Sequence, residues 1–255
     1  MTTPARRYRD VAATLRQAIN NGVYPRGSLL PNEDQLAAEL DVNRATVNKA
    51  LNILKSEGLL RVHMGVGTYV HELPTILRDA AVRHSRAHRE RGGLRGSLAS
   101  ELDQLGYALD SDNTIGPGRP PADVADVLGV DSDSDSVIVR ARRMRAQGVP
   151  IQIVTSYIPR EIADGTPIAE RDSGVGGISS RLADLGYAQA EIEENLRVRP
   201  PTPDEARFLR MTPDQRVIEI FHIGWTATNR AVKINVYILP SYQWNLRYRY
   251  PADPV

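Results

Sequence analysis

The chain contains no cysteine among its 255 residues. A disulfide framework and thiolate chemistry are therefore excluded, and this composition fits a reducing compartment, so we expect a cytoplasmic protein. No apolar run approaches the ~20 residues that a membrane-spanning helix needs. The first ten residues, MTTPARRYRD, have no apolar core behind their charges. We therefore expect neither a signal peptide nor a membrane partner.

The chain also lacks an excess of either charge, because it has 32 basic and 31 acidic residues. The two parts of the sequence nevertheless differ: residues 1–95 contain 15 basic and 9 acidic residues, and residues 96–255 contain 17 and 22. A basic N-terminal part beside an acidic remainder indicates that only one end meets a polyanion. A chance asymmetry on solvated faces is the alternative.

Three helices are expected in the first sixty residues. Apolar residues recur at helical spacing over residues 8–21. The second helix is expected to begin at Asn32, which can cap exposed amides with Gln35 as its capping-box partner. The third helix follows a tight turn, with Asn43 as its cap. Its expected buried stripe is Val47, Ala50, Leu51 and Leu54.

The exposed start of the third helix is polar and is followed by a short hairpin. Polar side chains at the start of the second helix of such a pair are what a major-groove reader requires, and Lys49 and Lys55 are placed to reach phosphates. Leu59–Val62 and Thr68–His71 predict two strands around the tip 63–67. The glycines of this tip allow a close approach to the minor groove.

The segment LLPNEDQLAAELDVNRATVNKALNILKSEGLLRVHMGVGTYV resembles the winged helix of the GntR family, whose core reads like LPSE, SRxTVRxAL, EGL and GxGTFV. The match covers nearly all of residues 8–71. The resemblance implies that Arg44 and Thr46 contact the operator and that Gly65 enters the minor groove. We therefore predict that DNA is contacted by Asn43, Arg44, Thr46, Asn48, Lys49, His63 and Gly65. A winged helix used only for protein contacts is the alternative.

Two residues depart from the family pattern. Asn48 stands where the family usually has arginine, and Asn43 stands where it usually has serine. Arginine pairs with guanine and asparagine with adenine, and each good pair gives about 1–3 kcal/mol of discrimination. Asn48 therefore predicts that one operator position differs from the guanine usual for the family.

The rest of the chain contains an internal repeat. We expect domains at 1–73 and 96–255, joined by an arginine-rich linker at 74–95. LDQLGY at 102–107 matches LADLGY at 182–187, and each copy reads as helix, strand, short helix and two long strands. The long strands are expected at Ser136–Met144, Ile151–Ile158, Val217–Thr226 and Val232–Leu239. Two such halves predict one antiparallel sheet with helices on its faces, an α+β domain with a pocket between the halves.

GISSRLADLGY, RRMRAQGVPIQIVTSYIP and VKINVYILP follow in this order. They resemble the UTRA effector domain of the HutC subfamily, whose fold resembles chorismate lyase. The resemblance implies that Arg143 and Arg145 bind anionic groups of an effector and that Thr155 and Tyr157 contribute polar atoms. Paired arginines suit carboxylate or phosphate because they bind both oxygens. A solvated strand edge rich in arginine is the alternative.

The effector is expected to be anionic or less polar than an amino sugar. Val154 and Lys233 stand where the family often has acids, and we include Lys233 in the effector site. The sequence thus predicts an effector-controlled repressor that binds a palindromic double-stranded operator as a homodimer. No catalytic residue, metal site or cofactor is expected. The alternatives are a DNA-binding regulator without an effector and a lyase-like activity in the C-terminal domain.

Overall fold

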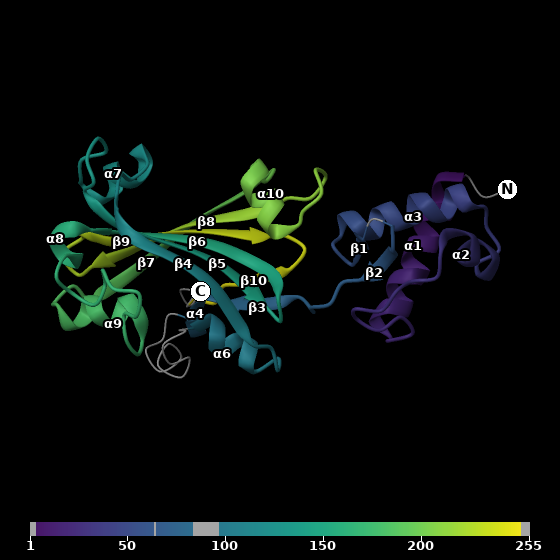
Figure 1. Ribbon diagram of the computed structural model, residues 1–255, viewed down its shortest axis with the longest axis horizontal. Coiled ribbons are helices and arrows are strands. Elements are labelled where there is room, and N and C mark those ends of the chain that lie inside the picture. Colours follow the sequence, from purple (N-terminus) through teal and green to yellow (C-terminus); the bar gives the residue numbers. More distant parts are fainter. Residues whose placement is uncertain (1–3, 64, 84–96, 251–255) are drawn as a thin grey trace, which may run out of the picture. The chain divides into compact units, whose positions relative to one another are not determined.

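The computed structural model describes residues 4–63, 65–83 and 97–250 (Figure 1). The chain forms two compact units. The first contains residues 1–75 and 212–215, and the second contains the remaining residues. Each unit is described by itself.

The first unit has three helices and a two-stranded hairpin. Its elements are α1 (Pro4–Asn20), α2 (Glu33–Glu39), α3 (Arg44–Ser56), β1 (Leu60–His63) and β2 (Gly67–Val70). The helix α1 begins four residues earlier than the apolar pattern predicts, with Pro4 at a position where proline needs no amide partner. The two strands pair antiparallel from Leu60 opposite Val70 to His63 opposite Gly67.

The helix caps and the core of this unit confirm the sequence prediction. The side chain of Asn32 accepts from the Gln35 amide at 2.9 Å, and that of Asn43 accepts from the Thr46 amide at 2.8 Å. These bonds satisfy amides that an uncapped helix would leave unpaired. The stripe of α3 is buried as expected and packs against α1, α2 and the hairpin through Val47, Ala50, Leu51 and Leu54.

The second unit is built on one six-stranded antiparallel sheet in the order β4-β5-β6-β9-β8-β7. Its strands are β4 (Leu109–Gly118), β5 (Val137–Ala146), β6 (Val149–Pro159), β7 (Gln189–Arg199), β8 (Val217–Thr226) and β9 (Ala231–Pro240). The four predicted long strands correspond to β5, β6, β8 and β9, and the predicted α+β architecture is confirmed. The two repeats meet where β6 pairs with β9.

Helices cover both faces of the sheet (Figure 1). On one face lie α7 (Ala122–Leu128) and α10 (Pro203–Leu209), which bury Leu128 and Leu209 against the strands. On the other face lie α8 (Arg160–Ala163) and α9 (Gly177–Asp184), where Leu182 packs on Ile138 and Ile158. This second face is the one that holds the cavity described below.

The start of the expected linker belongs to the second unit. The strand β3 (Ile76–Asp79) pairs in parallel with β10 (Trp244–Arg247) near the C-terminus. The short helix α4 (Ala80–Arg83) follows it, and α6 (Ser97–Asp103) begins the first repeat. Residues 84–95 of the predicted linker lie outside the described residues. The first ten residues of the predicted linker, 74–83, therefore include ordered structure rather than a free connection.

Candidate DNA-reading and effector-binding sites

The N-terminal turn of α3 presents cationic side chains to solvent. Arg44 is 66% exposed at its side chain, and Lys49 is exposed on the same helix. The Thr46 hydroxyl donates to Asn43 Oδ1 at 2.9 Å, so the cap fixes the first turn and one predicted contact residue together. This surface has the polar and cationic groups that a major-groove reader needs.

An acid of α2 lies against this surface and was not included in the sequence-based prediction. Glu33 accepts from Arg44 Nε at 2.9 Å and from Asn48 Nδ2 at 2.8 Å. These two hydrogen bonds lower the pKa of Glu33 below its usual value. The sequence signal was the acid directly after the cap Asn32, but a residue contacting α3 from another helix is not visible in periodicity.

The hairpin tip needs glycine for two separate reasons. Gly65 has a φ of +76°, in the left-handed region, and Gly67 has a φ of +145°. A Cβ atom at Gly67 would lie 2.7 Å from Leu29 Cδ1. The side chain of His63, another predicted DNA contact, lies outside the described residues. The tip is thus shaped as a narrow backbone turn with little side-chain bulk at Gly65.

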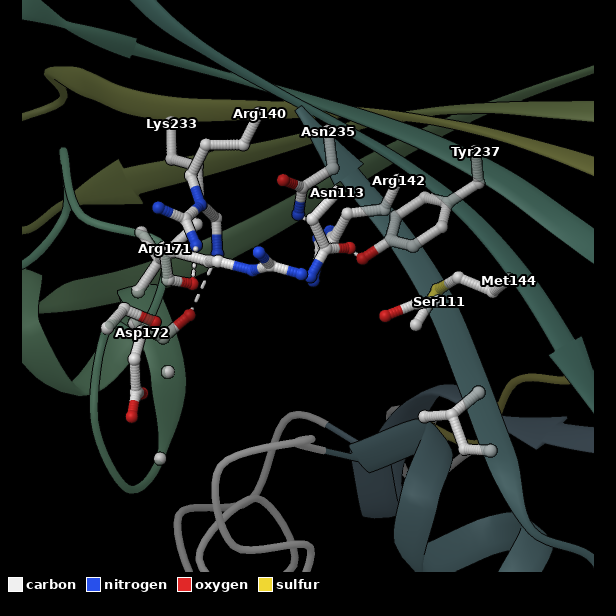
Figure 2. A pocket seen from close by; sticks show the side chains of 16 residues that line it. Ser111, Asn113, Arg140, Arg142, Met144, Arg171, Asp172, Lys233, Asn235 and Tyr237 are labelled. Atoms are coloured by element: carbon white, nitrogen blue, oxygen red, sulfur yellow. Dashed lines mark hydrogen bonds between the residues drawn. The ribbon is translucent and has the colours of Figure 1, made fainter. Parts of the chain in front are cut away.

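A polar cavity of about 240 Å³ lies on the face of the sheet that α9 covers (Figure 2). Strands β4, β5 and β9 and the segment 171–179 line it. Both halves of the repeat therefore contribute, in agreement with the predicted pocket between them. Its principal polar side chains are Asn113, Arg140, Arg142, Asp172, Lys233, Asn235 and Tyr237.

Arg140 joins β5 to the segment 168–171 at one wall of the cavity. Its guanidinium donates to the backbone carbonyls of Ile168, at 2.7 Å, Glu170 and Arg171, the last at 3.2 Å. The side chain is buried, and burial with the neighbouring charge of Arg142 lowers the pKa of Arg140 to about 10. Neutral carbonyls thus accept from its terminal nitrogens without cancelling its charge, and its buried Nε has no hydrogen-bond partner.

Arg142 has fewer hydrogen bonds than Arg140 or Lys233, the two buried cations of the cavity. Its Nη2 donates to Ser156 Oγ at 3.3 Å, and its buried Nε has no hydrogen-bond partner. Among the residues that the structure describes, no carboxylate lies within ion-pair distance of Arg142. Burial is the largest cause of its lowered pKa, and nearby Arg83 acts in the same direction. An anion in the cavity would compensate this charge.

Lys233 and Tyr237 line the cavity from β9. Lys233 is buried and donates to Ser179 Oγ at 2.8 Å. The Tyr237 hydroxyl accepts from Asn235 Nδ2 at 3.2 Å (Figure 2). The structure therefore places Lys233, one of the predicted effector residues, in the cavity, together with the unpredicted Arg140 and Arg142.

The other four predicted effector residues lie on the opposite face of the sheet. Arg143 and Arg145 contact the Phe208 ring of α10, at 5.3 and 5.0 Å from its centroid. Tyr157 packs in the cluster below α7, and Thr155 faces the same side because it lies two residues away on β6. These four residues therefore do not line the cavity, because the strand β5 carries arginines at both parities and the sheet turns Arg140 and Arg142 toward it.

At the equivalent position of the second repeat, described side chains of the chain itself occupy the space. Glu194 and His222 pair across β7 and β8 as Asn113 and Arg142 pair across β4 and β5. Arg78 of β3 inserts there and forms a buried ion pair with Glu194, and its guanidinium lies 5.4 Å from the Tyr237 ring centroid. Arg78 therefore occupies in the second repeat the position that corresponds to the space beside Asn113 and Arg142 in the cavity.

Two further classes of site were searched in the residues that the structure describes. No group of three or more His, Cys, Asp or Glu side chains could hold a metal ion there. None of the helices in the described ranges is long and apolar enough to cross a bilayer.

Comparisons with known proteins match both parts of the chain. The family described as bacterial regulatory proteins, gntR family, matches residues 7–70, and the UTRA domain matches residues 114–242. An HTH-type transcriptional regulator of Streptomyces coelicolor is 27% identical, over 98% of this chain and 96% of that protein. Another, of Rhizobium meliloti, is 28% identical over 97% and 92%.

The fold also matches a solved structure. PhnF from Mycobacterium smegmatis superposes with a TM-score of 0.58 at 18% identity, covering 95% of this chain and 100% of that one. At this identity the likeness shows the fold alone. The two matched domains together cover the N-terminal reader and the sheet that holds the cavity. The chain therefore belongs to the GntR/HutC-like family of transcription regulators, with a GntR DNA-binding domain followed by a UTRA effector-binding domain.

Proposed function

We propose that this regulator is a repressor that holds a palindromic operator as a homodimer and releases it when a small anionic effector enters the β4/β5/β9 cavity. Two copies related by a two-fold axis would place two α3 helices on successive major grooves, so protein symmetry and operator symmetry would mirror each other. Binding to chromosomal DNA, with a chain free of cysteine, is consistent with a cytoplasmic protein.

The charge of the cavity carries this proposal. Arg140 is buried and Arg142 is half-buried beside it, and neither forms an ion pair with a carboxylate among the described residues. Asp172, the one acid of the lining, is exposed. An uncompensated buried cation is costly, and an anion that enters the cavity removes part of this cost. Bidentate hydrogen bonding to a guanidinium favours carboxylate or phosphate groups.

The lining of the cavity favours ligand binding without turnover over a lyase-like activity. Among the residues that line the cavity, the cations donate to hydroxyls and backbone carbonyls, as Lys233 does to Ser179 and Arg140 to Ile168. General acid–base chemistry needs a titratable group poised near neutral pH. Neither arginine nor a tyrosine hydroxyl is such a group at its ordinary pKa.

The test uses the full chain on an operator recovered by selection from random duplex DNA. Small carboxylates, phosphate monoesters and their uncharged analogues are titrated while operator binding is followed by fluorescence anisotropy. We expect anions alone to release the operator, and Arg142→Met to keep operator binding but weaken the response by ~10-fold or more.

Arg143→Met is the matched control, because it removes the same charge from the next residue on the opposite face of β5. We expect this variant to respond like the unmodified protein. Release by uncharged analogues as readily as by anions, or loss of the response in Arg143→Met but not in Arg142→Met, would contradict the proposed cavity.

A further inference from the structure

A row of polar side chains runs along one side of α3 and ends on Glu33 of α2. Lys55 Nζ donates to Asn52 Oδ1 at 3.4 Å, and Asn52 Nδ2 donates to Asn48 Oδ1 at 3.2 Å. Asn48 Nδ2 then donates to Glu33 Oε1 at 2.8 Å. Residues three and four apart are neighbours on a helix surface, so the row is continuous. Every donor in it points toward the carboxylate.

The same carboxylate fixes one edge of Arg44. Arg44 Nε donates to Glu33 Oε2 at 2.9 Å, so this nitrogen is occupied. A guanidinium has five N–H groups in a planar fork, and the bond at Nε leaves the two terminal nitrogens available. Two terminal nitrogens are the donors that reach O6 and N7 of guanine together. Glu33 therefore holds Arg44 in the orientation that guanine recognition uses.

Asn48 is held by the same carboxylate. Reading adenine requires the amide nitrogen and the amide oxygen of asparagine at once, because adenine presents one acceptor and one donor. Asn48 donates one of its two N–H groups to Glu33, and its oxygen accepts one bond from Asn52. One N–H and one lone pair therefore remain for a base, and the bonds to Glu33 and Asn52 fix the plane in which Asn48 presents them.

We propose that Glu33 is a positioning residue that sets the base preference of the operator-reading surface, by directing the terminal nitrogens of Arg44 outward and by fixing the amide plane of Asn48. This proposal rests on the proposed operator-reading function of α3. Arg44 then presents both terminal nitrogens to guanine, and Asn48 presents one N–H and one lone pair in a fixed plane.

The charge of Glu33 affects DNA binding separately from its effect on the orientation of Arg44. Glu33 is only 26% exposed and its hydrogen bonds to Arg44 and Asn48 keep it ionised, so a negative charge lies beside the surface that meets DNA. A carboxylate near phosphates weakens binding to every duplex, whatever its sequence. Glu33 should thus lower the affinity for every duplex while it raises the discrimination between base pairs. Both effects can be measured in one experiment.

The experiment compares the full-length protein with Glu33→Gln by sequencing the duplexes that each retains and by measuring affinity for the preferred and a scrambled site. The glutamine has the same shape, but its single oxygen cannot accept from both partners in their present orientations. We expect equal or tighter binding to the scrambled site, and a loss of discrimination of about 10-fold at the base pair that Arg44 reads. Thermal unfolding of both proteins verifies that α2, capped by Asn32, is intact.

Asp34→Asn is the matched control, because Asp34 is the neighbouring acid, is 73% exposed and lies 3.7 Å from Arg44 Nε without a hydrogen bond. It should tighten binding to all duplexes and leave base preference unchanged. If Glu33→Gln behaves in the same way, Glu33 acts through charge alone and the proposal is overturned. If the unmodified protein itself retains no preferred duplex, the operator-reading function on which the proposal rests is overturned instead.

Discussion

Three arginines of the second unit differ in how the protein compensates their charge. Arg78 is fully buried and pairs with Glu194, so its charge is cancelled within the fold. Arg140 donates from its terminal nitrogens to backbone carbonyls that leave its charge in place, and its Nε has no partner. Arg142 has one neutral partner and one unsatisfied nitrogen. The residue with the least compensation is the one expected to gain most from an anionic ligand.

His71 should make the first unit sensitive to mild acid. Its Nδ1 accepts from the Leu73 amide at 3.2 Å, and burial lowers its pKa to about 4. The unfolded value is near 6.5, so the unfolded chain binds more protons between these two pH values. Stability is therefore complete above pH 6.5 and falls as the pH decreases toward 4, by up to about 3 kcal/mol.

Urea unfolding of the full chain at pH 7.5 and pH 5 measures this effect. The variant His71→Gln, which carries no titrating ring, should show a smaller difference between the two pH values than the unmodified protein. An equal pH dependence in both proteins would show that other groups cause it.

At the scale of elements, the cap of α3 links stability to DNA reading. Asn43→Ala removes the acceptor for both the Thr46 amide and the Thr46 hydroxyl. We expect the free energy of unfolding to fall by about 1 kcal/mol and operator affinity to fall with it. Asn43→Ser, the residue usual in the family, should retain both properties. Circular dichroism on heating and anisotropy with operator DNA provide the two measurements, and an alanine variant as stable as the serine variant would refute the capping role.

Elements with local signals could be predicted from the sequence, and elements that depend on distant partners could not. The cap residues Asn32 and Asn43 act within three residues of the chain, and their roles were correctly predicted. The pairing of β3 with β10 joins Ile76 to Trp244 and has no local signal. The segment 74–83 was therefore expected to be a linker.

The strand β5 shows why the arginines that face the cavity could not be identified from the sequence. Its sequence VIVRARRMRA has arginines on both faces, at Arg140 and Arg142 and at Arg143 and Arg145. Alternation separates the two pairs but does not say which face is covered by α9 and which by α10. That choice is made by helices far along the chain. The residue type and the strand could therefore be predicted, but the face could not.

The whole molecule uses one duplicated unit for two purposes. The first repeat leaves a cationic cavity open, and the second repeat fills the equivalent position with Arg78 from the strand that directly follows the DNA-binding unit in sequence. Tyr237 lines the cavity and also lies under Arg78. A ligand in the cavity would therefore lie beside the same Tyr237 ring that Arg78 covers.

Recognition of a duplex by the exposed start of α3 is tested by the affinity of the full chain for a selected operator in moderate salt, before and after Arg44→Met. We expect a loss of about 1–3 kcal/mol with relaxed base choice at one position. Lys55→Met should weaken all sequences alike. A protein that retains no defined duplex, or that binds its operator equally well without the Arg44 guanidinium, would show that α3 does not read DNA.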